Sequence, residues 1–222
     1  MACWSAENAT QAYLRTVKMG KRAKEPDVAE FVSALAAGNS SQVMVEVCAG
    51  VAGATTIALV AAAHQTGGQV VCILPGLEEL HLSEEALGPN ADCVEFVAGD
   101  AKSILVNNYI GADFVLIDCT LEGHEGVFGV VQASAKKKGG AVVVGYNACK
   151  GSGWRSDDES KTQLLPIGEG LLVSRIPATT KIRGGDGGST GRRSRWVVTV
   201  DKCTGEEHVF RITSAHRNGI QT

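Results

Sequence analysis

The residues best suited to chemistry in this chain follow a short run of small side chains. Residues 43–59 read VMVEVCAGVAGATTIAL, a strand-like run that turns through small residues into a helix-like run. Such a turn places backbone N–H groups and the positive end of a helix beside an anionic or polar ligand. We therefore predict that Cys48, Gly50 and Gly53 contribute to a ligand-binding loop.

The same loop departs from the dinucleotide pattern G-x-G-x-x-G. Cys48 stands in place of the first glycine, and Leu74-Pro75 stands where an acid would bind the ribose at the end of the second strand. The sequence therefore does not favour NAD as the ligand.

Two acidic residues lie where a ligand could meet them. Glu46 interrupts an apolar strand-like run, where a buried carboxylate is costly unless a ligand or backbone donors meet it. Asp100 follows the third strand in EFVAGDA, at the edge where open α/β sheets bind ligands. Asp100 also precedes the helix-like AKSIL and is a suitable helix N-cap. The two roles of Asp100 can coexist, and both stay open.

A second polar group, DCTLEGHEG at 118–126, follows the fourth strand. Asp118 ends that strand, and His124 is a candidate general base near neutral pH. The alternative is a solvent-exposed loop histidine beside two carboxylates, and we favour it for a histidine in such a segment.

An alternation of strands and helices must position these residues. Helix-like segments at 53–65, 78–87, 101–108 and 123–138 separate apolar strand-like runs at 43–47, 70–74, 93–97, 113–118 and 141–146. Near-continuous Val, Ile and Leu in the strands indicates a parallel sheet covered on both faces. The alternation predicts a doubly wound, Rossmann-like α/β fold with right-handed crossovers.

The flanking segments follow other patterns. Residues 163–176 read as two strands around Gly168-Glu169-Gly170, which predicts an antiparallel hairpin after the parallel core at 43–176. Residues 7–37 predict two N-terminal helices, 178–195 a flexible, basic, glycine-rich loop, and 196–212 an extra β-hairpin. We expect all of them to belong to one domain over residues 1–222.

Composition narrows the class of protein. The chain has 222 residues, 44% of them hydrophobic, and a net charge of −3, which suits a soluble protein and gives no reason to expect nucleic acid binding. We expect neither a membrane-spanning segment, because no apolar run is long enough, nor a secretory signal, because the start has no basic region followed by an apolar one. Its seven cysteines contain no C-x-x-C pair and predict reduced thiols without zinc, in the cytoplasm.

Six segments in this order resemble the class I S-adenosylmethionine-dependent methyltransferases, in the caffeoyl-CoA and catechol O-methyltransferase branch. They are DVAEFVSALAAGNSSQVMVEVCAG, GGQVVCIL, VEFVAGDA, ADFVLID, GGAVVVGYN and LLPIGEGLLVSRI. The chain is still more similar to a plant family of methyltransferase-like proteins without an assigned function. The resemblance implies S-adenosylmethionine (SAM) as cofactor and places the following residues at its site: Glu46, Cys48, Gly50, Gly53, Asp100, Ala101 and Asp118.

Departures from the branch concern its catalytic part. The branch has an acid near Leu74 that binds the ribose, and a lysine at the position of Leu121. Its divalent metal is held by the acid ending the fourth strand, which matches Asp118, and by an Asp-Asn pair that is Asn147-Ala148 here. One carboxylate and one amide make a poor Mg²⁺ site, so we expect no metal.

The resemblance implies a small-molecule O-methyltransferase. Asp118, which matches the family's acid, and His124, from its place in the segment 118–126, are the catalytic candidates. The alternative is a non-catalytic sensor or interaction protein on the same fold. The basic residues near 15–24 and 181–195 suit a phosphate-bearing acceptor such as a CoA thioester, although such runs are most often solvated faces. Aromatic residues make up 5% of the chain, which does not favour RNA, and a homodimer is one arrangement that the sequence allows.

Overall fold

The computed structural model describes residues 4–19, 27–151, 154 and 161–178, and the backbone of 194–200 and 207–213. By its internal contacts the chain divides into two compact units, Met1–Thr180 and Lys181–Thr222. The candidate site lies in the first unit.

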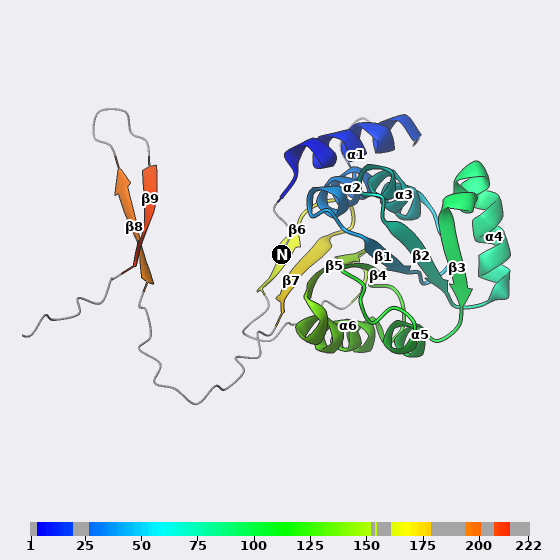
Figure 1. The fold of residues 1–222 in the computed structure, drawn as a ribbon. Helices are drawn as coiled ribbons and strands as arrows, with labels where there is room; N and C mark the ends of the chain where they lie inside the picture. The colour runs from blue at the N-terminus through cyan, green and yellow to red at the C-terminus, as the bar shows by residue number, and fades with distance from the viewer. Residues whose placement is uncertain are drawn as a thin grey trace, which may run out of the picture. The chain divides into compact units, whose positions relative to one another are not determined.

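A sheet of seven strands organises the first unit (Figure 1). Its strand order is β3-β2-β1-β4-β5-β7-β6; β3, β2, β1, β4 and β5 are parallel, whereas β7 is antiparallel to both β5 and β6. The strands are β1 (Val43–Val47), β2 (Gln69–Leu74), β3 (Val94–Ala98), β4 (Phe114–Asp118), β5 (Gly140–Tyr146), β6 (Lys161–Leu165) and β7 (Leu171–Pro177).

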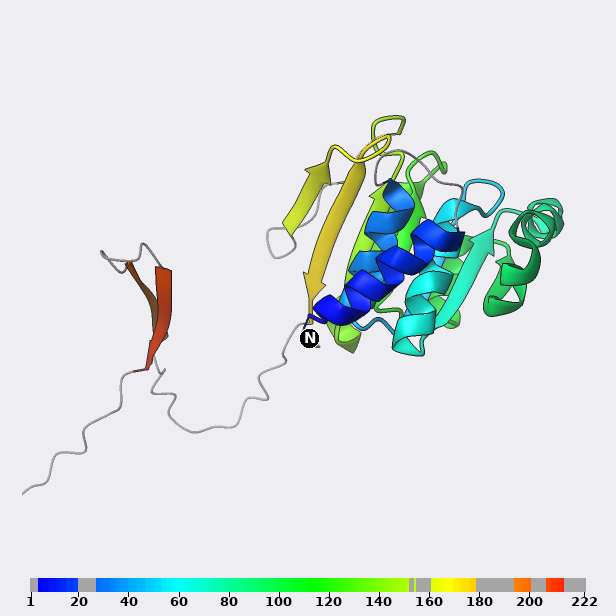
Figure 2. The same ribbon diagram turned by 90° about the horizontal axis from the view of Figure 1, so that it is seen from above.

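Helices cover both faces of this sheet. α1, α2 and α3 lie on one face and α5 and α6 on the other, while α4 lies beside β3 (Figure 1). Figure 2 shows the blue helices α1 and α2 lying across their face of the sheet. The helices are α1 (Ala6–Met19), α2 (Val28–Gly38), α3 (Ala54–Thr66), α4 (Leu77–Leu87), α5 (Ala101–Asn107), α6 (His124–Lys138) and a 3₁₀ helix, Gly88–Cys93.

The apolar side chains of the strands alternate between two cores. Val45, Val71 and Val115 pack on the α5–α6 side, whereas Met44 and Val70 pack on the α1–α3 side. Strand side chains point to opposite faces with a period of two, so a strand must be apolar at every position to fill both cores. The continuous Val, Ile and Leu runs are therefore explained by two covered faces.

The predicted doubly wound α/β fold is confirmed, including the antiparallel hairpin at its end. The observed strands and helices of the parallel core begin and end within two residues of the predicted bounds. The 3₁₀ helix Gly88–Cys93 was not predicted, since its sequence GPNADC has turn residues and no helical periodicity.

The second unit contains one antiparallel hairpin, β8 (Ser194–Val200) and β9 (Glu207–Thr213). It matches the extra hairpin predicted at 196–212. Most of the predicted basic loop at 178–195 lies outside the described residues. Among the helices that the structure describes, none has the length and apolar character needed to cross a membrane.

Candidate functional site

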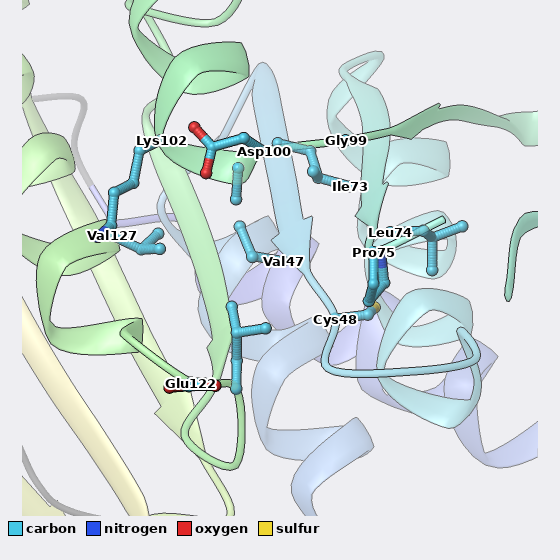
Figure 3. A pocket seen from close by; sticks show the side chains of 12 residues that line it. Val47, Cys48, Ile73, Leu74, Pro75, Gly99, Asp100, Lys102, Glu122 and Val127 are labelled. Atoms are coloured by element: carbon cyan, nitrogen blue, oxygen red, sulfur yellow. The ribbon is translucent and has the colours of Figure 1, made fainter. Parts of the chain in front are cut away.

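A cavity of about 180 Å³ opens at the carboxyl edge of the parallel strands (Figure 3). The strand order reverses between β1 and β4, and open α/β sheets bind ligands beside this switch point. The ends of β1 and β2, the β3–α5 turn and the β4–α6 segment all line the cavity. Its lining residues are Val47, Cys48, Ile73, Leu74, Pro75, Gly99, Asp100, Ala101, Lys102, Leu121, Glu122 and Val127.

The small-residue loop lies between β1 and α3, as its sequence predicts. The Cys48 N–H donates to the carbonyl oxygen of Ile73 at 3.0 Å, and Cys48 lines the cavity. Gly53 is the N-cap of α3 and makes no side-chain cap. A Cβ atom built on Gly50 or on Gly53 would have nothing within 4 Å, so the chain leaves open space beside both. Neither glycine lines the cavity itself.

Glu46 has a structural environment. Its side chain is fully buried, and the Thr55 and Thr56 hydroxyls donate to its two carboxylate oxygens at 2.6 Å each. Desolvation raises the pKa of Glu46, while the hydrogen bonds from Thr55, Thr56 and Tyr146 oppose the rise. Glu46 is not among the residues that line the cavity, and its carboxylate is held instead by the Thr55 and Thr56 hydroxyls of α3.

Asp100 combines a cap with a cavity wall. Its Oδ2 accepts hydrogen bonds from the Ser103 N–H at 2.9 Å and the Ser103 hydroxyl at 2.7 Å, so it is the N-cap of α5. These two hydrogen bonds lower the pKa of Asp100, which keeps the carboxyl ionised. Both bonds use Oδ2, and Oδ1 has no hydrogen bond among the described residues. The neighbouring Ala101 also lines the cavity.

Asp118 is held by its own chain and does not line the cavity. Its Oδ1 accepts from the Thr120 N–H at 3.0 Å, the Thr120 hydroxyl at 2.8 Å and the Asn147 side-chain amide at 3.0 Å. Asn147 has a φ of 59°, a left-handed conformation that asparagine tolerates. The two residues expected to retain part of a metal site therefore bind each other.

His124 lies at the start of α6 and is 5% exposed. Its Nδ1 is 2.9 Å from the carbonyl oxygen of Leu121, and its ring is 6.2 Å from the ring of Trp154. The favoured interpretation of an exposed loop histidine is wrong, because His124 belongs to the first turn of α6 and is buried near Trp154. His124 does not line the cavity either.

Trp154 was not identified from the sequence. It is 5% exposed, stacks on Phe128 with ring centroids 4.7 Å apart, and donates its Nε1–H to the Ser174 hydroxyl at 3.1 Å. Its ring also lies against Gly145 of β5, where an added Cβ would be 2.3 Å from the ring. The indole therefore fills the space near the ends of β5 and α6.

Lys102 is another lining residue that the sequence did not reveal. Its Nζ would lie 2.5 Å from a Cβ atom on Gly126, so that glycine makes room for the lysine over the first turn of α6. Figure 3 shows Lys102 and Asp100 on the side of the cavity opposite Leu74 and Pro75. A glycine within a helical run was the one available signal for this contact.

A larger cavity, of about 660 Å³, lies at the amino edge of the sheet. Gln42, Asp113, Val142 and Arg175 are among its lining residues. Asp113 is already used there, since its carboxylate accepts from the Gln42 and Val43 N–H groups. Volume alone would favour this cavity, but it has neither the glycine loop nor the strand ends that bind ligands in this fold.

The sheet order, the glycine loop and the cavity at the switch point define a Rossmann-like methyltransferase fold. The chain itself belongs to a family described as "Protein of unknown function (DUF1442)", whose match spans residues 1–212. Among curated proteins, no sequence matches the chain.

Solved structures confirm the fold. The chain is similar to the methyltransferase PaMTH1 of Podospora anserina bound to SAH, S-adenosylhomocysteine. The TM-score is 0.56 at 14% identity, and the match covers 79% of this chain and 90% of that chain. It is also similar to a putative caffeoyl-CoA O-methyltransferase of Staphylococcus aureus, with a TM-score of 0.54 and 14% identity over 78% of this chain and 93% of that chain. A third similar structure is the O-methyltransferase TomG of Streptomyces achromogenes in complex with SAM, with a TM-score of 0.52 and 15% identity over 80% of this chain and 93% of that chain. The resemblance seen in the sequence is thus confirmed for the fold, and the plant source of its closer relatives stays a prediction.

Proposed function

We propose that this chain binds SAM at the carboxyl-edge cavity and transfers its methyl group to a small oxygen nucleophile without a metal ion. The observation that carries the proposal is the cavity itself, because it joins the glycine loop, the end of β2 and the β3–α5 turn. Solved relatives on this fold contain SAM or SAH, which supports the same class of ligand here.

The lining residues fit part of such a cofactor. Asp100 offers an ionised carboxylate with Oδ1 open to hydroxyl or amino donors, and Val47, Ile73 and Val127 offer apolar contacts. The open space at Gly50 and Gly53 allows a ligand to approach the backbone. However, about 180 Å³ is less than the roughly 300–1,000 Å³ of pockets that enclose drug-sized ligands. The bound cofactor would therefore stay partly exposed.

The end of β2 predicts weak binding. Leu74 is buried and lines the cavity where the resemblance implies a ribose-binding acid. A hydrogen bond to a charged group contributes about 1.5–3 kcal/mol, so its absence weakens affinity about ten- to hundredfold. We expect dissociation constants in the micromolar to millimolar range, corresponding to about −8 to −4 kcal/mol.

The catalytic step stays a proposal in which Asp118 and His124 are the candidate bases. SAM, when bound, would supply a methyl group attached to a positively charged sulfur. The acceptor oxygen would attack the methyl carbon in line with the bond to sulfur, and the sulfur would leave. The chain must hold the acceptor oxygen and take its proton. Because His124 is buried and held at Leu121, its use as a base requires the 119–123 segment to open. The acceptor class, including phosphate-bearing molecules, is not fixed by these contacts.

A non-catalytic SAM sensor is the second candidate, and a specific observation favours it. Asp118, Asn147 and His124 are engaged in contacts within the chain, so neither of the two candidate bases, Asp118 and His124, lines the cavity. Ligand binding would survive this arrangement, while methyl transfer would not.

Titration calorimetry of the full chain with SAM and with SAH tests the binding proposal. We expect saturable binding of one molecule per chain. No heat and no thermal shift at about 1 mM ligand, close to −4 kcal/mol, would exclude the cofactor. If SAH binds, a screen of phenols and CoA thioesters for methyl transfer separates the enzyme from the sensor, and His124→Ala should slow any turnover found by about 10²–10⁴.

A further inference from the structure

Two cysteines from neighbouring strands meet at the floor of the cavity. β1 and β2 are parallel with Glu46 opposite Cys72, and Cys48 lies two residues beyond Glu46. Side chains alternate along a strand, so Cys48 and Cys72 point to the same face of the sheet. Their Sγ atoms are 3.4 Å apart, and both cysteines are free thiols.

Only one of these cysteines belongs to the lining of the cavity, and it is 3% exposed. Cys48 lines it, whereas Cys72 is fully buried behind it. Ala52 and Leu74 pack around the pair and separate it from the bulk of the core. A small oxidant that enters the cavity therefore meets Cys48 first and finds Cys72 in place to react next.

We propose that Cys48 and Cys72 form a redox pair that hydrogen peroxide converts to an intramolecular disulfide. The Cys48 sulfur attacks one peroxide oxygen, the O–O bond breaks, and a sulfenic acid and water form. The Cys72 sulfur then attacks the Cys48 sulfur, the S–O bond breaks, and the hydroxyl leaves as water with the Cys72 proton. The two thiols lose two electrons in total, and the peroxide gains them.

The surroundings of Cys48 decide how fast this happens. The hydrogen bond with Cys72 and then burial raise the pKa of Cys48; the charge of Glu46 adds to the rise, and a hydrogen bond from Tyr146 opposes it. Since the thiolate is the nucleophile, the first step is slow at neutral pH and accelerates as pH increases. The second step requires the sulfurs to approach by roughly 1.3 Å, because they are 3.4 Å apart and a disulfide is about 2.05 Å long.

The rate of disulfide formation should also depend on whether a ligand occupies the cavity. This expectation rests on the proposed function. A ligand that covers the cavity wall covers Cys48 and excludes peroxide from it. Saturating SAH should therefore slow disulfide formation by at least about fivefold, which is the effect expected when most molecules are liganded.

The experiment treats the reduced full chain with hydrogen peroxide at about pH 7 and about pH 8.5, blocks remaining thiols with N-ethylmaleimide and maps peptides by mass spectrometry. We expect a Cys48–Cys72 linked peptide that forms at least about tenfold faster at the higher pH, as thiolate grows tenfold per pH unit. In Cys72→Ala, dimedone should trap the Cys48 sulfenic acid; in Cys48→Ala, Cys72 should stay a thiol. Cys93→Ser, at an exposed cysteine, is the matched control and should link normally.

The outcomes separate this proposal from the proposed function. Absence of the linked peptide in both wild type and Cys93→Ser would overturn the redox pair. So would thiols blocked by stoichiometric zinc, which would assign Glu46, Cys48 and Cys72 to a metal, since their ligand atoms lie within 4.8 Å of one another. A disulfide that forms equally fast with SAH, in a chain that calorimetry shows not to bind SAH, would remove the proposed function and leave the redox pair. Bound SAH without protection would show that peroxide does not enter through the cavity.

Discussion

The two halves of the carboxyl edge of the sheet use their space differently. Beyond β1, β2 and β3, the chain leaves a cavity, open space beside two glycines and a carboxylate oxygen without a partner among the described residues. Beyond β4 and β5, the polar residues bind each other, and Trp154 fills the space against Gly145. The first half therefore has more of the features of ligand binding, whereas in the second half Leu121 and Glu122 line the cavity but the polar side chains of Asp118 and Asn147 bind each other.

Trp154→Ala should cause the largest loss of stability, because it removes a buried ring that packs against Gly145 near the end of β5. Truncation of a buried aromatic residue costs about 3–5 kcal/mol of unfolding free energy, and the Ser174 hydroxyl also loses its donor. Urea denaturation measures the change. Trp4→Ala is the control, since Trp4 is 53% exposed, and should cost much less. Equal losses in the two variants would show that Trp154 does not belong to a packed core.

Asp100→Asn should weaken SAH binding about ten- to hundredfold while leaving stability nearly unchanged. Asparagine is as good an N-cap as aspartate, but it lacks the charge that a ligand donor would meet. Asp92→Asn, at an exposed aspartate that does not line the cavity, should bind SAH like the wild type. If Asp100→Asn binds SAH with unaltered affinity, the role of Asp100 is limited to the N-cap of α5.

Glu46→Gln should change how stability depends on pH. Burial raises the pKa of Glu46 above its ordinary value of 4.5, so the folded state holds this proton more tightly than the unfolded state. The stability that Glu46 contributes is therefore fully present below about pH 4.5 and is lost as pH rises through the folded pKa. Relative to Glu46→Gln, the wild type should become less stable as pH rises above about 4.5, as measured by urea denaturation. A difference in unfolding free energy that does not vary with pH would contradict the raised pKa of the buried carboxyl.

Addition of Mg²⁺ or Ca²⁺ should have the smallest effect, which is none on the melting temperature. The amide of Asn147 donates to Asp118 and Ala148 offers no side-chain ligand, so the oxygen ligands that these ions require are missing. Thermal shift assays at millimolar metal measure this. A saturable rise in melting temperature with metal that disappears in Asp118→Ala would contradict this prediction and support metal-assisted methyl transfer.

The sequence predicted the fold well because periodicity acts locally. The continuous apolar strands and the intervening helical segments fix a parallel sheet, and its order places the ends of β1, β2 and β3 together. Cys48 and Asp100 were placed near a ligand for this reason, whereas Ala101 was placed there by the resemblance, and all three line the cavity.

What the sequence could not predict depends on contacts between distant segments. Glu46 was placed on the cavity wall because its burial was recognised but its partners, the Thr55 and Thr56 hydroxyls, were not. His124 begins α6 and Trp154 follows β5 in the sequence, and only the packed structure shows that both side chains are buried. The amino-edge cavity likewise has no local signature.

The most direct test of the central claim is a titration of the ¹⁵N-labelled full chain with SAH, followed by backbone amide NMR. The account predicts saturable shifts at Cys48, Gly50, Gly53, Gly99 and Ala101, around the carboxyl-edge cavity. The exposed Asp92 and the amino-edge residues Gln42 and Arg175 should not shift. Shifts confined to the amino edge, or none at about 1 mM SAH, would contradict a cofactor site at the ends of β1, β2 and β3.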